Sequence, residues 1–366
     1  AEVVWQRPRL LVARAWLLYR HWRLQALDSV LRALTARLGE TDDVDLADEE
    51  LAERRFIYGQ VDALESATRF HLHFDFQAAV SAAERATTVL PPTEGGALGT
   101  AVISRAFAKI GLGEGSVAIR ELSHASRDPS PFGAASAQLH LGIWASHYMM
   151  GDLATLGESL GQVGIVGDRP IDGMAAANWF AGLMNYEQER LEEAQRFLKV
   201  MYNSRHELNY LGGFFSGYPL VRIHQIRKEI DDAQGLIDSL RSELLRMGNQ
   251  EFLRQLDGLQ AYQWLLTDKR ELADRWAKNY RTEDSPDSLI FVDPPGLIWV
   301  RIVLALGQEV DLDAALSYLE IKLRQLDGSQ FYRRQLQLLS HKAAVHAHVG
   351  DMEAAQACLC SALLLG

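Results

Sequence analysis

The sequence predicts an all-α fold, a superhelix (solenoid) of about nine antiparallel helix pairs. The first observation behind this prediction is a recurring five-residue word, of which Asp351-Met-Glu-Ala-Ala355 is one copy. The fifth residues of the nine copies, here called anchors, are Leu27, Ala79, Ala118, Leu156, Ala194, Ala233, Ala273, Ala315 and Ala355. After a first interval of 52 residues the anchors are 38 to 42 residues apart. A period of this size marks a repeat architecture, so we expect residues 1–366 to form one elongated domain.

The second observation concerns the position twelve residues before each anchor. It is occupied by Ala15, Ala67, Ala106, Trp144, Gly182, Val221, Ala261, Val303 and Ala343. Small residues dominate there, with Trp144 as the clear exception, and a small residue on each helix of a pair lets the two backbones approach closely. Two small positions across a short turn resemble the tetratricopeptide repeat. The period near 39 exceeds the usual value of about 34, so longer helices are expected.

Taken in chain order, each pair has a more apolar first helix and an amphipathic second helix. Residues 175–184 and 336–349 are apolar on more than one face, which predicts burial between neighbouring pairs. In the fifth pair, the second helix places Leu191, Ala194, Leu198 and Met201 on one face. Its opposite face carries charged and amide side chains, which indicates exposure to solvent.

Segments rich in helix-breaking proline and glycine predict the connections between pairs. They are Pro91-Pro92, Asp128-Pro-Ser-Pro131, Gly167-Asp-Arg-Pro170, Gly212-Gly213 and Asp293-Pro-Pro-Gly296. The long first interval contains an acidic insertion, Glu40–Glu50. We interpret it as a solvated loop that leads into a helix N-terminus, where carboxylates are favoured. A charged patch for a partner is the less favoured interpretation.

Composition excludes several classes of protein. A net charge of −11 and a pI near 5.5 disfavour direct contact with nucleic acid. No apolar run approaches the length of a membrane span, and no signal peptide is visible at the start. Cys358 and Cys360 point to different sides of one helix, which disfavours a mutual disulfide and fits a reducing compartment. We therefore expect a cytoplasmic protein with no membrane contact.

No complete catalytic or metal-binding motif occurs in the sequence. The sequence has no phosphate-binding loop and no nucleophile elbow. The histidine pairs His71/His73 and His346/His348 are two residues apart, so on a helix they point in different directions and cannot chelate one metal. We expect a protein that is not an enzyme and binds no metal.

What remains is the concave surface, which the first helices line in a tetratricopeptide superhelix. By this resemblance, inward positions fall eighteen, fifteen, eleven and eight residues before each anchor. In the fourth to seventh pairs the predicted ligand-binding residues are Gln138, Tyr148, Trp179, Tyr186, Phe215, Tyr218, Arg222, Gln225, Gln255 and Tyr262. Aromatic faces can stack on a ligand while Arg and Gln orient it. The alternative is that several of these rings belong to the core. Under the groove interpretation, Trp179→Ala and Tyr218→Ala leave melting nearly unchanged.

The opening of the chain carries a second resemblance. Arg7-Pro-Arg-Leu-Leu-Val-Ala-Arg-Ala-Trp-Leu-Leu18, followed by Trp22-Arg-Leu-Gln-Ala-Leu27, is similar to the helical region after the ATPase in large ATP-binding LuxR-type transcriptional regulators. That family includes a maltotriose-responsive activator of maltose genes. The resemblance covers essentially the whole chain. The family's nucleotide-binding module and helix-turn-helix have no counterpart here, so we expect a domain excised from a larger regulator.

This second resemblance implies an effector-sensing and oligomerisation module that binds a small molecule in its groove. It implies no cofactor in this domain, because ATP and DNA would bind only the flanking domains. Expected partners are thus a small-molecule effector and either another copy of the chain or a partner protein. The alternative function is a tetratricopeptide-like scaffold that binds a peptide or helix of a partner.

Overall fold

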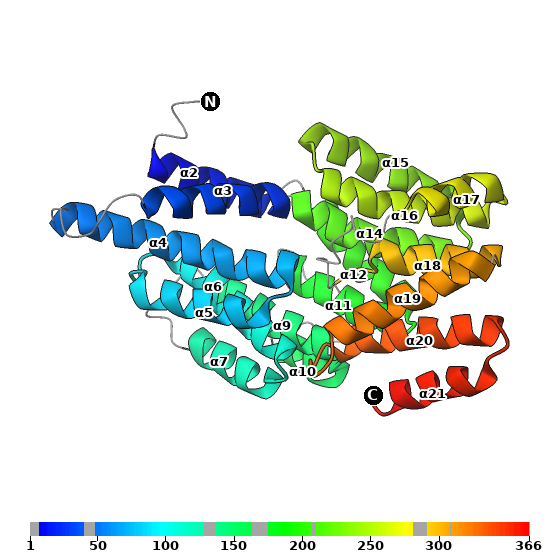
Figure 1. The fold of residues 1–366 in the computed structure, drawn as a ribbon. Coiled ribbons are helices and arrows are strands. Elements are labelled where there is room, and N and C mark those ends of the chain that lie inside the picture. The colour runs from blue at the N-terminus through cyan, green and yellow to red at the C-terminus, as the bar shows by residue number, and fades with distance from the viewer. Residues whose placement is uncertain are drawn as a thin grey trace. The chain divides into compact units, whose positions relative to one another are not determined.

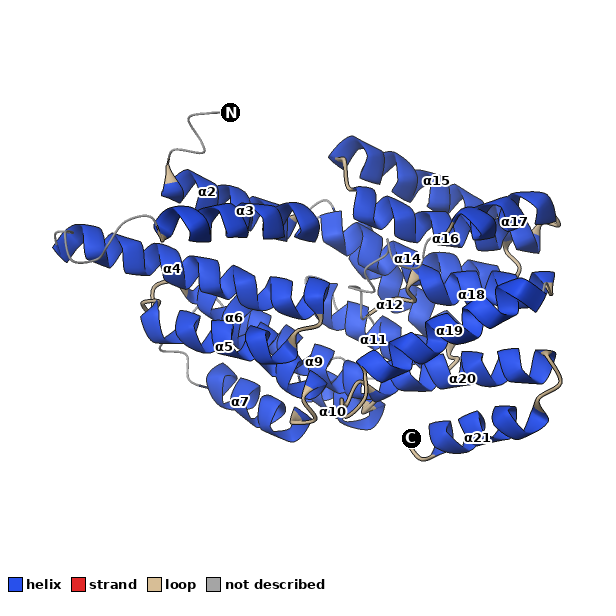
Figure 2. Cartoon of the chain, viewed as in Figure 1, coloured by secondary structure: helices blue, strands red, loops and turns tan. Residues whose placement is uncertain are grey.

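The computed structural model describes residues 7–39, 48–127, 136–162, 175–205, 210–280, 291–307 and 309–365. Across these ranges the regular structure is helical throughout and no strand occurs (Figure 2). Within the described residues the helices follow one another along the chain as nine pairs, and Figure 1 labels them in that order. The predicted all-α, tetratricopeptide-like superhelix is confirmed as the fold class. In these same ranges, no helix is both long and apolar enough to cross a bilayer.

The chain divides into two compact units. Unit 1 comprises Ala1–Ser146 with Gly328–Gln330, and unit 2 comprises His147–Asp327 with Phe331–Gly366. The elements up to the division are α2 (Pro8–Arg20), α3 (Leu24–Leu38), α4 (Asp48–Thr68), the π-helix η2 (Arg69–His73), α5 (Phe76–Val89), α6 (Gly95–Gly111), α7 (Gly115–Arg127) and α9 (Ser136–Met150). A single domain over residues 1–366 stays a prediction.

Unit 2 contains the remaining helices. They are α10 (Leu153–Gln162), α11 (Ala175–Glu187), α12 (Leu191–Asn203), α14 (Tyr210–Ile226), α15 (Ile230–Met247), α16 (Gln250–Leu266), α17 (Arg270–Asn279), α18 (Pro295–Leu306), α19 (Glu309–Gln325), α20 (Tyr332–His348) and α21 (Met352–Leu363). The first helices of its pairs from the fifth onward are α11, α14, α16, α18 and α20.

The periodic positions form the core of each pair. All nine anchors are buried, with at most 3% of the residue exposed. The positions twelve residues earlier are buried as well, including the bulky exception Trp144. Gly182 shows why a small residue is needed, because a Cβ there would lie 2.6 Å from Leu198 Cγ on the partner helix. The repeat pattern therefore identified the helix–helix contacts correctly.

One turn geometry joins the two helices in most pairs. In eight pairs the residue just before the repeated word has a positive φ, as at Gly151, Lys228 and Gly350. In seven of them the next main-chain N–H donates to the carbonyl five residues earlier, for example from Asp351 to His346 at 2.9 Å. This is the Schellman ending of a helix. The repeated word thus marks a helix end as well as a helix start.

Some of the connections that the helix-breaking residues predicted are confirmed and one is not. Pro91-Pro92 lies between α5 and α6, as expected, and Pro295 begins α18. Gly212-Gly213 was wrongly predicted as a connection, because both glycines lie inside α14. Of the acidic insertion, residues 48–50 form the first turn of α4. The predicted connections at 128–131 and 167–170 lie outside the described residues.

Candidate functional site

Four of the predicted ligand-binding residues meet around one cavity in unit 2. These are Tyr148, Tyr186, Tyr218 and Arg222, and they come from α9, α11 and α14. The cavity measures about 10 Å³, which is room for about one water molecule. The remaining lining residues are Leu183, Pro219, Phe291, Val292, Asp293 and Arg333. The predicted residues therefore converge, but on a closed site.

Most of the predicted ligand-binding residues are buried, as the alternative of a core role expects. Seven of the ten are buried, namely Tyr148, Trp179, Phe215, Tyr218, Arg222, Gln225 and Gln255. Gln138, Tyr186 and Tyr262 are partly exposed. Since buried aromatic residues support the core, we now expect Trp179→Ala and Tyr218→Ala to lower the melting temperature, contrary to the groove interpretation. Ligand binding by the ten residues stays a prediction.

A short segment of the chain, Phe291–Asp293, here called the plug, covers this site. It precedes α18 and all three of its residues are buried. The Phe291 ring packs among aromatic side chains of the predicted ligand-binding residues. Its centroid lies 5.3 Å from Trp179, 6.3 Å from Tyr148 and 6.4 Å from Phe215. The plug thus fills space that the sequence assigned to a ligand.

Side chains of the surrounding helices hold the plug's main chain. The Tyr218 hydroxyl donates to the Asp293 carbonyl at 2.8 Å. Arg334 Nη2 donates to the Val292 carbonyl at 2.9 Å. Among the described residues, no main-chain to main-chain hydrogen bond involves Phe291, Val292 or Asp293. Side-chain donors on the surrounding helices therefore satisfy the plug's carbonyls, as a groove does for a bound peptide.

The Asp293 carboxylate is the charged centre of the site. Arg301 Nη1 donates to its Oδ2 at 2.7 Å, and Gln337 Nε2 donates to Oδ1 at 3.2 Å. Burial opposes ionisation, but the guanidinium groups of Arg301, Arg222 and other nearby arginines outweigh it. They hold the pKa of Asp293 well below its usual value, so this carboxylate is ionised at neutral pH.

Arg222 also lines this cavity, but it forms no ion pair with a carboxylate in the described part of the chain. Its Nη1 donates to Gln225 Oε1 at 2.9 Å, and its guanidinium lies 4.7 Å from the Tyr262 ring centroid. Only 7% of the residue is exposed, and its Nε has no hydrogen-bond partner within the described part of the chain. A buried guanidinium in this state favours an anion beside it.

A second ion pair involves Arg333, which also lines the cavity. Arg333 Nε donates to Glu187 Oε1 at 2.7 Å, and the Tyr148 hydroxyl donates to the same oxygen at 2.9 Å. The Arg333 guanidinium lies 4.4 Å from the Tyr148 ring centroid. Burial raises the pKa values of Tyr148 and Tyr218, so both hydroxyls are protonated and act as donors.

The other predicted residues occupy different surroundings. Gln225 Nε2 donates to the Leu259 carbonyl at 3.1 Å, which ties α14 to α16. Gln255 is buried in α16 and its Oε1 has no partner among the residues described. Gln138 belongs to unit 1, where its Nε2 lies 3.5 Å from Thr100 Oγ1. The structure therefore does not assign Gln138 to the cavity in unit 2.

One histidine cluster has the geometry of a potential cation site. Ligand atoms of His224, Glu229 and Asp232 lie within 4.8 Å of one another. His224 Nδ1 already contacts Glu229 at 2.5 Å, and a comparable contact joins His147 to Asp152 at 3.1 Å. Because the same pairing recurs across another hairpin turn, we interpret it as a feature of the turn.

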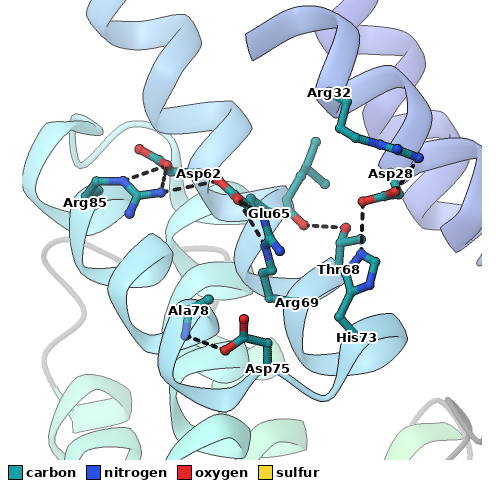
Figure 3. A network of polar contacts seen from close by, with 11 residues as sticks. Asp28, Arg32, Asp62, Glu65, Thr68, Arg69, His73, Asp75, Ala78 and Arg85 are labelled. Atoms are coloured by element: carbon teal, nitrogen blue, oxygen red, sulfur yellow. Dashed lines mark hydrogen bonds and ion pairs between the residues drawn. The ribbon is translucent and has the colours of Figure 1, made fainter. Parts of the chain in front are cut away.

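Unit 1 has an open hollow of about 840 Å³ between α4 and α5. Its wall includes Asp62 and Arg85, which form an ion pair with Arg85 Nε 3.0 Å from Asp62 Oδ1 (Figure 3). Burial raises the pKa of Asp62 and Arg85 opposes that change. In another part of unit 1, His73 Nε2 lies 3.0 Å from Asp28 Oδ1 and connects η2 to α3 (Figure 3). These contacts join neighbouring helices and converge on no enclosed space.

The sequence analysis missed the plug and the arginines around it. Asp293 was assigned only to a turn, because Asp-Pro-Pro-Gly is a strong breaker pattern. One signal was present: the position eighteen residues before the ninth anchor is Gln337, which contacts Asp293. Arg301 and Arg333 fall at none of the four inward offsets, so the periodic pattern could not identify them.

Comparison with known proteins gives a fold and no family. No family model and no curated protein matches the chain. Among solved structures, the apo form of RapI is similar at a TM-score of 0.51 and 10% identity, covering 98% of this chain and 97% of that one. The Rap conjugation gene regulator of plasmid pLS20, in complex with the Phr* peptide, is similar at a TM-score of 0.50 and 11% identity, covering 99% and 93%.

These similarities support a tetratricopeptide-like helical-repeat fold. They give no support to the resemblance to LuxR-type regulators or to a small-molecule effector, both of which stay predictions. At this level of identity, the chain is similar to the Rap structures in fold alone.

Proposed function

We propose that this chain is a binding protein without enzymatic activity, and that its first helices in unit 2 bind a peptide or a segment of a partner protein. The observation that carries the proposal is the plug. Its ring is held by aromatic side chains, its carbonyls by Tyr218 and Arg334, and its carboxylate by Arg301. A surface that holds three residues of its own chain in this way has the chemistry to hold a peptide.

The structural comparison supports the same function. The Rap regulator of plasmid pLS20 was solved in complex with a peptide, and its fold is similar over nearly the whole chain. The polar groups of the cavity favour a peptide over a sugar. They satisfy main-chain carbonyls and a carboxylate, while the aromatic rings lie against one another or against Phe291.

The proposal can be tested by selecting binders without assuming their sequence. A displayed heptapeptide library is selected on the immobilised full chain, and synthetic versions of the enriched peptides are measured by isothermal titration calorimetry. A panel of sugars and other metabolites is screened in parallel by thermal shift. A peptide present at 100 times its Kd stabilises the chain by about 2.7 kcal/mol. Lys278→Ala, which changes an exposed side chain of α17, serves as a control that keeps binding.

The expected result is a peptide that binds stoichiometrically and raises the melting temperature. If no selected peptide binds in calorimetry while a metabolite stabilises the chain, the proposed function is wrong. The earlier small-molecule prediction is then favoured.

A further inference from the structure

We infer that the plug is a displaceable internal ligand and that the external peptide resembles it, with a large apolar residue two positions before an acidic one. This inference rests on the proposed function and names the class of peptide. It also assigns the plug an autoinhibitory role, because plug and peptide compete for one site.

The cavity is so small that the plug and a bound peptide must compete for the site. With the plug in place, the space beside Tyr148, Tyr186, Tyr218 and Arg222 is about 10 Å³, enough for about one water molecule. No side chain of a peptide fits into that volume. A peptide that reaches these residues must therefore replace Phe291–Asp293.

The bonds that hold the plug are ones that a separate peptide can reproduce. Its carbonyls accept from Tyr218 and Arg334, and its carboxylate accepts from Arg301 and Gln337. No main-chain ladder in the described residues would have to be broken to release it. Pro294 follows directly in an extended conformation, with φ −66° and ψ 153°, and it has no N–H to lose.

The charges indicate what the peptide carries. The plug brings one carboxylate, and its ion-pair partner is Arg301. Arg222 lines the same cavity and only 7% of the residue is exposed. Its Nε has no hydrogen-bond partner among the described residues. A second acidic group would pair with Arg222. A peptide with two carboxylates therefore has an advantage that the plug lacks.

The test supplies the plug in trans to the full-length chain. The probe is an N-terminally fluorescein-labelled peptide, Phe-Val-Asp-Pro-Pro, whose sequence is that of residues 291–295. Its affinity is measured by fluorescence anisotropy for the parent and for the variant Phe291→Ala/Asp293→Asn, which vacates the ring and carboxylate positions. We expect the variant to bind at least about tenfold more tightly than the parent, because it no longer competes.

Two comparisons distinguish specific recognition of the peptide from nonspecific binding. Replacing Asp by Asn in the peptide should weaken binding to the variant by about tenfold or more, the usual worth of a hydrogen bond to a charged group. Adding Arg301→Gln to the variant should remove that discrimination. Arg227→Gln is the control, because Arg227 directly follows α14 and pairs with Gln195 and Glu192, neither of which lines the cavity.

Each outcome decides the inference. Equal binding of the Asp and Asn peptides, or a folded variant that binds neither, overturns it. If the double variant does not fold, the near-isosteric Asp293→Asn replaces it in the same comparisons. A library peptide that binds parent and variant with equal affinity leaves the proposed function standing and refutes the plug. Absence of any peptide binder refutes both.

Discussion

Gly182 offers a quantitative test of the repeat geometry. It lies on α11, and a Cβ at this position would lie 2.6 Å from Leu198 Cγ and 3.2 Å from Leu198 N. Normal carbon–carbon contacts are about 3.5–4.0 Å, so α11 and α12 must separate by about 1 Å in Gly182→Ala. Overpacking of this kind costs about 1–3 kcal/mol. Alanine's better helix propensity returns about 0.5–1 kcal/mol, which leaves a net loss of about 1 kcal/mol.

Gly235 is the matched control, since it lies in the interior of α15 and is exposed. A Cβ there has no atom within 4 Å, so Gly235→Ala should gain about 0.5–1 kcal/mol from propensity alone. Urea unfolding followed by circular dichroism compares the two variants. Their difference of about 2 kcal/mol should appear as a lower midpoint for Gly182→Ala than for Gly235→Ala at equal m-value. Equal midpoints would refute the close approach of α11 and α12.

Three further changes probe the site and the turns. Asp293 has a depressed pKa, so the stability that its carboxylate contributes is present above the ordinary Asp pKa of about 3.9 and is lost as the pH falls below it. The free energy of unfolding should therefore fall less steeply below about pH 4.5 in Asp293→Asn than in the parent. Phe291→Ala should cost about 3–5 kcal/mol in chemical denaturation, whereas Leu364→Ala, at 88% exposure, should stay within about 0.5 kcal/mol. Asp351→Ala removes the cap that Asp351 Oδ1 gives Ala354 N at 3.0 Å, which should lower stability by about 1 kcal/mol by the same measurement.

The parts of the fold that the sequence predicted depend on local patterns. The small residue Gly182 lies close to Leu198 of the next helix, so the burial of this position is encoded within a single hairpin. The same local patterns were misleading at Gly212-Gly213. There the glycines lie within α14, and Gly213 would place a Cβ 3.1 Å from Arg205 Cδ, so tertiary packing makes use of a residue with poor helix propensity.

The candidate site was predicted less completely, because its key contacts are not local. Four predicted residues do line the cavity, since tetratricopeptide-like first helices share a face. The plug's position depends on Tyr218 meeting Asp293, 75 residues away, and on Arg334 meeting Val292, 42 residues away. Periodicity specifies which face of a helix is buried. It carries no information about which segment buries it.

The π-helix η2 at the end of α4 changes how one hairpin is wound without changing its length. In the second pair the main-chain N–H of Asp75 reaches back six residues to the Arg69 carbonyl, whereas seven other hairpins span five. Ala67 and Ala79 are nevertheless twelve residues apart, as in the other pairs, and both are fully buried. The wider turn therefore comes from local rewinding of the same number of residues. The winding of a helix end can thus differ from pair to pair while the residue spacing, and with it the side chains that become buried, stays the same.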